Sequence, residues 1–459
     1  MTERLKPSKY NHFVPGSDGN WLAFNAMLCG LAEMDDATYH QVLRLVEGAT
    51  PAEAGVSDDL LENLKAGGFL IDSEAYEIKT VRAHHYRVRF AQTGFSLTVV
   101  PTYTCNFGCI YCYENPGLRG MPAKQGSVMS EDMCANVVTL CRQRVPANDS
   151  LHVTWYGGEP LIGKKIIGSL SKQLMDVCRE KNSSYHAAIV TNGYLLSEEN
   201  LRFLRDCRVS FVQITIDGPR EVHDGRRPLR SGRATYDTIM ANIGRIPADY
   251  PMHLSIRINI DRDNADRVPE LFEDFKSMGL HEKPNVSFNF GHTVHYGSCA
   301  AGSLNCMATE EFSEFIVKAF KTGVDYGFRV AILPSANLSG CGAVGLSNAL
   351  IEPNGNVQTC WVTVGADEKS VGVLTADGIV YNHRQDRWLG WDPFAGECEA
   401  CSVLPICMGG CPNKALFHDD GAQEGGNVCT WWKYDLKPML TVARYAQERG
   451  LLALPGRSG

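Results

Sequence analysis

Residues 101–112 read PTYTCNFGCIYC and directly follow the run FSLTVV, residues 95–100. The β-branched and aromatic residues of FSLTVV predict a strand, which places Cys105, Cys109 and Cys112 on the loop at its carboxyl end. Three soft thiolates close together suit an iron–sulfur cluster, and they are one fewer than a closed four-iron cluster needs. The stretch therefore predicts a cluster with one iron open to a cofactor or substrate. A zinc site is the alternative for the same cysteines.

Further short β-branched runs follow along the chain, separated by amphipathic helical stretches. They are LHVTWY (151–156), AAIVT (187–191), FVQITI (211–216), LSIRINI (254–260) and VSFNF (286–290). The helices between them are expected to begin near Ser130, Gly163, Ser197, Tyr236 and Asn264. This alternation predicts parallel strands with crossover helices, and six such strands predict an α/β fold with a partial (β/α)6 barrel over residues 93–330.

Chemistry in such barrels collects where strands end and loops begin. The polar or glycine-rich residues at the predicted strand ends are Gly157, Gly158, Glu159 and Pro160 after the second strand, Thr191 and Asn192 after the third, and Asp217 after the fourth. Glycine lets a backbone approach a ligand closely, although each motif taken alone is equally compatible with a turn. Arg257 lies within the fifth strand, where its guanidinium suits either a bound carboxylate or a barrel salt bridge.

Residues 1–92 show a different pattern. The stretch HFVPGSDGNWLAFN, residues 12–25, predicts a hairpin, and two helices follow it, the first starting after Asp35 or Asp36. The strand FLID, residues 69–72, closes this unit. The order resembles the small winged-helix-like peptide-recognition domain fused to many peptide-modifying enzymes. A generic N-terminal cap is the alternative.

Composition excludes several classes of protein. The chain has 459 residues and a net charge of −8, without a basic run, so nucleic acid is not expected as a partner. The N-terminus has no apolar stretch after its charges, and no window reaches the roughly 18 apolar residues of a membrane helix. The sequence therefore predicts a cytoplasmic protein with no membrane partner.

Ten of the seventeen cysteines fall into two groups. The second group, in the Gly-, Cys- and Trp-rich residues 331–459, is Cys341, Cys360, Cys398, Cys401, Cys407, Cys411 and Cys429. In a large chain without an export signal, such groups indicate metal binding, not disulfides. The scattered cysteines are expected to be small buried hydrophobes, namely Cys29, Cys134, Cys141, Cys178, Cys207, Cys299 and Cys306.

The spacing of the first group, with Tyr111 just before its last cysteine, resembles the radical S-adenosylmethionine superfamily, and the resemblance covers residues 94 to about 330. It implies that S-adenosylmethionine chelates the open iron through its methionyl amine and carboxylate. It also implies that an electron from the cluster breaks a carbon–sulfur bond, and that a 5′-deoxyadenosyl radical then abstracts hydrogen from a substrate.

The same resemblance assigns cofactor contacts. Gly157 to Pro160 are expected to hold the methionyl amine through backbone carbonyls, and Thr191 and Asn192 to lie near the ribose and methionyl region. Asp217 is expected near the cofactor or substrate, and Arg257 is a candidate partner for the methionyl carboxylate.

The seven C-terminal cysteines resemble a SPASM domain, the extension of radical enzymes that modify peptides and proteins. The resemblance implies two auxiliary [4Fe-4S] clusters, for a total of three. One would be closed by Cys398, Cys401, Cys407 and Cys429, and the other held by Cys341, Cys360 and Cys411. Residues 332–340 contain no cysteine to complete the second set. Either that cluster has an open iron or it recruits Cys299 or Cys306.

One departure from the family bears on function. Anaerobic sulfatase-maturing enzymes carry an aspartate base directly after the cysteine equivalent to Cys360, whereas Trp361 stands here. We therefore expect a maturase of a ribosomally made precursor peptide, installing a cross-link, thioether, epimerised centre or similar change. Its expected partners are that peptide or a protein substrate and a flavodoxin- or ferredoxin-type one-electron reductant. The alternatives are a protein maturase, such as a sulfatase maturase, and a non-catalytic iron–sulfur carrier or zinc-stapled interaction protein.

Overall fold

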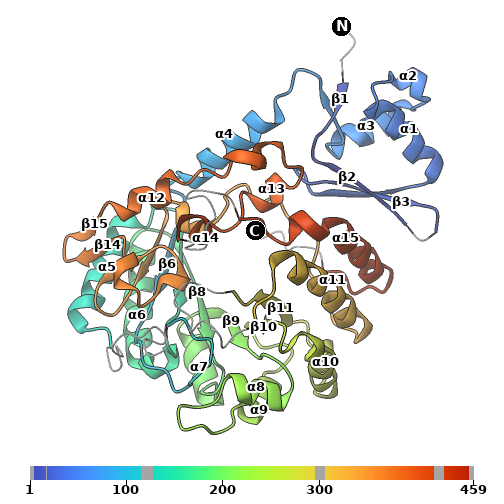
Figure 1. Ribbon diagram of the computed structural model, residues 1–459. Coiled ribbons are helices and arrows are strands. Elements are labelled where there is room, and N and C mark those ends of the chain that lie inside the picture. Colours follow the sequence, from blue (N-terminus) through green and yellow to red (C-terminus); the bar gives the residue numbers. More distant parts are fainter. Residues whose placement is uncertain (1–4, 17, 115–127, 295–304, 418–427, 454–459) are drawn as a thin grey trace.

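The computed structural model describes residues 5–16, 18–114, 128–294, 305–417 and 428–453. Its centre is a ten-stranded sheet with the strand order β11-β10-β9-β8-β7-β6-β12-β13-β14-β15 (Figure 1). Six parallel neighbours follow the chain: β6 (Phe95–Val99), β7 (Ser150–Trp155), β8 (Ser184–Thr191), β9 (Val209–Thr215), β10 (His253–Ile260) and β11 (Val286–His292). They coincide with the six predicted strands, so the predicted α/β fold with a large, mostly parallel sheet is confirmed.

Helices connect these strands and cover one face of the sheet. They are α5 (Glu131–Arg144), α6 (Lys164–Glu180), α7 (Glu198–Asp206), α8 (Arg220–Arg226), α9 (Tyr236–Gly244), α10 (Val268–Ser277) and, after β11, α11 (Thr309–Asp325). Leu97, Trp155 and Ile214 are buried in one hydrophobic core with residues of the helices. Thr98 and Gln213, which alternate with them along the strands, are less buried. A helix-covered face and an open face fit a partial barrel.

The predicted helix starts agree with the structure where a polar cap is present. Ser130 accepts a hydrogen bond from the Met133 amide at 3.1 Å, and Ser197 caps α7 in the same way. Near Asn264 the chain instead forms a short 3-10 turn (Ala265–Arg267), and α10 begins at Val268. The α-helix starts late because a proline occupies its first turn, where the missing amide hydrogen costs nothing.

The sheet continues into the C-terminal part of the chain. β12 (Asn348–Ile351) pairs in parallel with β6, so a segment some 250 residues later extends the barrel sheet. β13 (Asn356–Gln358), β14 (Gly372–Thr375) and β15 (Gly378–Tyr381) then add as antiparallel neighbours. The segments before and after residue 330 therefore share one sheet.

The N-terminal segment forms its own small sheets and core. β2 (Asn11–Pro15) and β3 (Trp21–Asn25) form the predicted hairpin, and β4 (Gly30–Met34) adds a third strand that the sequence pattern did not indicate. The helices that follow are α1 (Asp36–Val46), α2 (Pro51–Ala54) and α3 (Asp58–Ala66). β5 (Leu70–Asp72) then pairs with β1 (Leu5–Pro7).

Two further helices join the N-terminal segment to the remainder of the molecule (Figure 1). α4 (Glu77–Arg89) leads from it towards the sheet, and α15 (Trp432–Glu448) packs on α11 and β2, with a break in helical geometry at Asp435. Short helices α12 (Arg384–Gly390), α13 (Leu404–Cys407) and α14 (Pro412–Phe417) lie among the C-terminal cysteines. Across the described ranges, no helix combines the length and the apolar character needed to span a membrane.

Candidate active site and cluster sites

A cavity of about 300 Å³ lies at the carboxyl ends of the parallel strands, where barrel chemistry is expected. Its wall includes all three cysteines of the first group. Six of the predicted cofactor residues also line it, namely Tyr111, Gly157, Gly158, Thr191, Asn192 and Arg257. Glu159, Pro160 and Asp217 are not part of the lining.

The three thiols lie close enough to influence one another electrostatically. Burial, followed by the charge of Glu159, raises the pKa of Cys105 to about 12, and burial also raises the pKa values of Cys109 and Cys112. Buried thiols of this kind ionise when a metal supplies compensating positive charge. The Phe107 amide donates to the Cys105 sulfur at 3.4 Å, a contact of the type that tunes cluster potentials. The donor set therefore fits an iron–sulfur cluster.

The two glycines after β7 pack directly against the segment that leads into the cysteine loop. Gly157 has a φ of +114°, and a Cβ there would lie 2.5 Å from a methyl group of Val100. A Cβ on Gly158 would lie 2.5 Å from the carbonyl oxygens of Tyr103 and Thr104. Both positions require glycine because the loop after β7 packs against the backbone that leads to Cys105.

Glu159 is a fully buried carboxylate that ties two strand ends together. It accepts hydrogen bonds from the Thr191 hydroxyl at 2.8 and 2.9 Å, from the Asn192 amide at 2.8 Å and from the Leu161 amide at 3.1 Å. Asn192 in turn donates to the Asn106 side chain at 2.7 Å, beside Cys105. This chain of contacts fixes the third strand end relative to the cysteine loop.

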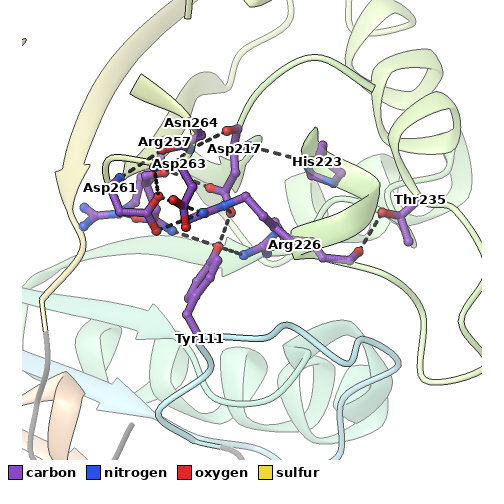
Figure 2. Close-up of polar contacts among 11 residues, drawn as sticks. Tyr111, Asp217, His223, Arg226, Thr235, Arg257, Asp261, Asp263 and Asn264 are labelled. Atoms are coloured by element: carbon purple, nitrogen blue, oxygen red, sulfur yellow. Dashed lines mark hydrogen bonds and ion pairs between the residues drawn. The ribbon is translucent and has the colours of Figure 1, made fainter. Parts of the chain in front are cut away.

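Tyr111 anchors the loop from the other side through a buried polar network (Figure 2). Its hydroxyl donates to the Asp217 carboxylate and accepts from Arg227 at 2.5 Å and from Asn259 at 3.1 Å. The Asn259 amide also donates to Asp217 at 3.1 Å. Asp217 thus supports the aromatic residue of the cysteine motif from behind the cavity wall.

A second arginine completes this network. Arg226 donates to both oxygens of Asp261, at 3.0 and 2.8 Å, and its Nε lies 3.7 Å from Asp217. Asn264 donates to the backbone carbonyls of Asp217 and Asn259 at 2.6 and 2.8 Å. Since these groups are buried, their mutual pairing is what makes their burial tolerable.

Arg227 is a functional candidate that the sequence pattern missed. It lines the cavity, and its guanidinium opposes the rise that burial causes in the pKa of Cys109. Its Nε is buried and has no hydrogen-bond partner among the described residues, and the same holds for the Thr293 hydroxyl, which also lines the cavity. Two unsatisfied polar groups in one wall fit a polar, partly anionic ligand such as S-adenosylmethionine. Arg227 follows no strand end directly, so no sequence signal marked it.

Arg227→Met is expected to weaken S-adenosylmethionine binding about ten-fold or more, because a charge-assisted contact is lost. Arg227→Lys keeps the charge and should bind with intermediate affinity. Arg233→Met, an exposed change in the same connection, is the control. Anaerobic equilibrium dialysis at matched iron content provides the measurement. Equal affinity of Arg227→Met and the parent protein would remove Arg227 from the cofactor site.

The C-terminal cysteines form two groups in space. Burial raises the pKa of Cys398 to about 11, and the thiols of Cys407, Cys401 and Cys429 add to this shift. Burial likewise raises the pKa of Cys360 to about 12, with contributions from Cys341 and Cys411. The structure therefore brings together the same two sets that the resemblance implied.

Of the two candidates for a fourth ligand beside Cys341, Cys360 and Cys411, Cys306 lies within the described residues. The Cys306 thiol contributes to the raised pKa of Arg262. The thiols of Cys411 and Cys306 both oppose the fall that burial causes in the pKa of Lys414. Cys299 lies outside the described residues. Within the described ranges, no three His, Cys, Asp or Glu side chains converge on one point as ligands of a single metal ion do.

Comparison with known proteins identifies the class. Residues 99–282 match the family described as the Radical SAM superfamily, and the chain is a radical S-adenosylmethionine enzyme. It is 25% identical over 357 residues to the serine-type anaerobic sulfatase-maturating enzyme of Bacteroides thetaiotaomicron, covering 70% of this chain and 83% of that protein. It is 23% identical to a cysteine-type enzyme of Clostridium perfringens, covering 74% and 94%.

Solved structures show the same fold. The chain resembles native anSMEcpe with bound AdoMet, with a TM-score of 0.58 at 19% identity over 77% of this chain and 97% of that one. It also resembles Streptococcus suis SuiB bound to precursor peptide SuiA, with a TM-score of 0.50 at 13% identity over 93% and 99%. At these identities the likeness concerns the fold alone.

Proposed function

We propose that this chain is a radical S-adenosylmethionine enzyme of the SPASM type that matures a ribosomally synthesised precursor peptide. The observation that carries the proposal is the place of Trp361, which follows Cys360 and lines the cavity. An indole cannot accept a proton, so the aspartate base of sulfatase maturation has no counterpart at this position. S-adenosylmethionine, when bound, supplies the radical chemistry, and the chain supplies orientation and exclusion of water.

The proposed cofactor site is built from the cavity wall. Cys105, Cys109 and Cys112 would hold the cluster with the open iron. Gly157, Gly158, Thr191, Asn192 and Arg257, together with Arg227, would surround S-adenosylmethionine, and Tyr111 would hold the loop in place. Glu159, Pro160 and Asp217 would act from behind the wall as positioning residues.

The two C-terminal cysteine sets would hold the auxiliary clusters and carry electrons. Cys401 lines a surface depression of about 440 Å³ together with Lys433 and Lys437. A cluster edge close to the surface and beside lysines supports electron exchange with an acidic one-electron carrier of flavodoxin or ferredoxin type. The reducing cytoplasm is the compartment that suits this enzyme and such an electron carrier.

A groove in the N-terminal segment supports peptide binding. β4 is the outer strand of its sheet, and a groove of about 560 Å³ runs between β4 and α3. Its wall includes Leu31, Ala32, Leu60, Asn63 and Phe69. An open strand edge beside an apolar groove suits an extended peptide that adds as a further strand.

Asn63→Arg is expected to reduce modification of the precursor peptide about ten-fold or more, because the long cationic side chain fills the groove. Glu62→Arg places the same side chain at the neighbouring exposed position outside the groove, with a charge change of two units instead of one, and should leave modification unchanged. Mass spectrometry of a co-expressed peptide gives the readout. Equal losses in the two variants would show an effect of charge and not of the groove.

The proposed function is tested by incubating the reduced, cluster-replete protein with S-adenosylmethionine and each short peptide that the neighbouring open reading frames encode. Formation of 5′-deoxyadenosine together with a mass change in the peptide is the expected result. 5′-Deoxyadenosine without any change in the peptide would overturn the peptide-maturase proposal while leaving the enzyme class intact.

Sulfatase maturation is a second candidate, and the relatives reported above favour it. It predicts that a peptide carrying a sulfatase serine or cysteine is converted to an aldehyde, which hydrazide labelling detects. Such a product would mean that another group in the cavity replaces the aspartate base.

A further inference from the structure

The cavity has two chemically different sectors. Arg227 and Arg230 come from the connection after β9, and Arg257 comes from β10. Two aromatic lining residues, Phe107 and Tyr111, lie beside Arg227 in this basic sector. Four others form a separate group, which we call the aromatic sector, namely Tyr103 and Tyr113 from the connection after β6, Tyr156 from the end of β7, and Trp361 from the turn after β13.

The aromatic sector is held in a defined geometry. The rings of Tyr156 and Trp361 have centroids 4.8 Å apart with an interplanar angle of 31°. The indole Nε1 of Trp361 donates to the Thr98 hydroxyl at 3.2 Å, which fixes the ring orientation. The hydroxyls of Tyr113 and Tyr156 are hydrogen-bonded to each other. Trp361 nevertheless remains 41% exposed, so part of its surface is available to a ligand.

The electrostatics of this sector favour a cation. Aromatic faces carry negative quadrupole potential, and tryptophan attracts cations most strongly. Glu114 also lines the cavity, and its charge acts on Tyr103, Tyr113 and Tyr156. Arg257 lies at the border of the sector, where its charge opposes the rise that burial causes in the pKa of Tyr156. It is also the candidate partner of the methionyl carboxylate.

We propose that the aromatic sector binds a cationic side chain of the substrate peptide, lysine or arginine, with the charge over Trp361 and Tyr156. This inference rests on the proposed function. A long aliphatic stem packs along the rings, while the phenol oxygens and the Glu114 carboxylate accept hydrogen bonds from the charged head. An aromatic guest would gain stacking but would carry no charge to pair with the Glu114 carboxylate.

Small peptides of defined sequence test this preference. The probes are acetyl-Gly-Gly-Lys-Gly-Gly-amide and its norleucine and tryptophan counterparts, added to the anaerobic, cluster-replete protein with S-adenosylmethionine. Saturation-transfer NMR competition measures their relative affinities. The lysine peptide is expected to bind about five-fold tighter than the norleucine peptide, which has a similar stem without the charge. Equal binding of these two, or tighter binding of the tryptophan peptide, would overturn the proposal.

Variants test whether the lysine preference arises at the aromatic sector. Trp361→Leu should abolish the lysine preference, and Trp361→Phe should retain part of it because a smaller aromatic face remains. Phe211→Leu is the matched control, since Phe211 is 39% exposed on β9 and does not line the cavity. Iron content and absorption spectra confirm that each variant carries its clusters. A lysine preference that survives Trp361→Leu would place the cation elsewhere.

This inference and the proposed function fail separately. Modification of the co-expressed peptide without any lysine preference in the probes would contradict cation binding at the aromatic sector and would support the maturase proposal. A lysine preference that depends on Trp361, without any modification of the co-expressed peptide, would support cation binding at the aromatic sector and would contradict the maturase proposal.

Discussion

Replacement of Cys105, Cys109 and Cys112 together by alanine is expected to abolish the cleavage of S-adenosylmethionine. All three thiols line the cavity, and the described residues that line it include no other cysteine to replace them. Production of 5′-deoxyadenosine should fall to the background without enzyme, since the electron donor and the chelating iron are both lost. On the proposed complement of three four-iron clusters, iron should fall by about four of about twelve atoms per chain, because the C-terminal cysteine sets are separate.

The matched control for this experiment is Cys134→Ala on α5, where the thiol is buried in the barrel core. It should keep both its iron and its activity, with only a modest loss of stability. Survival of 5′-deoxyadenosine formation in the triple variant would refute the assignment of the open cluster to this loop. Loss of all iron would show instead that the auxiliary sets depend on it.

Arg89→Met is expected to lower stability more than any exposed substitution. Arg89, at the end of α4, is 4% exposed and donates to the carbonyls of Trp388, Leu389 and Trp391 at 3.1, 2.9 and 2.8 Å, and to that of Val344 at 2.9 Å. Three of these carbonyls lie at the carboxyl end of α12, where carbonyls lack partners within the helix, and that of Trp388 also accepts from the Trp391 amide. Methionine keeps the bulk but leaves buried acceptors unsatisfied, at a cost of about 3 kcal/mol.

The measurement is the apparent midpoint of thermal unfolding under anaerobic conditions, together with resistance to thermolysin. Arg87→Met on the same helix is the control, because Arg87 is exposed. The midpoint should fall by several degrees for Arg89→Met and remain unchanged for Arg87→Met. Equal midpoints would mean that water satisfies the carbonyls once the guanidinium is gone.

Local patterns were sufficient for much of the barrel. The β-branched and aromatic runs FSLTVV and LHVTWY predicted two strands, because such side chains pack well on a pleated surface, and these strands pair in parallel. Ser130 and Ser197 marked helix starts because a hydroxyl satisfies an otherwise unpaired amide. The cysteine spacings pointed to clusters because thiolate ligands must lie close together in sequence or in space.

Other features depended on contacts between distant segments. β12 is four residues long and joins β6 across some 250 residues, which no local periodicity encodes. Arg226 and Arg227 are adjacent in sequence, yet one pairs with Asp261 and the other contacts Tyr111 and faces the cavity. Glu159 was expected at the cofactor but is buried under hydrogen bonds from Thr191 and Asn192.

The sequence by itself determined the class of enzyme, since Cys105, Cys109 and Cys112 after a strand already specify ligands, spacing and an open iron. Only the tertiary structure decided which side chains surround that site. Trp361 reaches the cavity because the C-terminal strands extend the barrel sheet, and Arg227 reaches it because Tyr111 and Asp217 hold its loop in place. Ligand identity is a local property of the chain, whereas the charge and shape of a pocket arise from segments that meet only on folding.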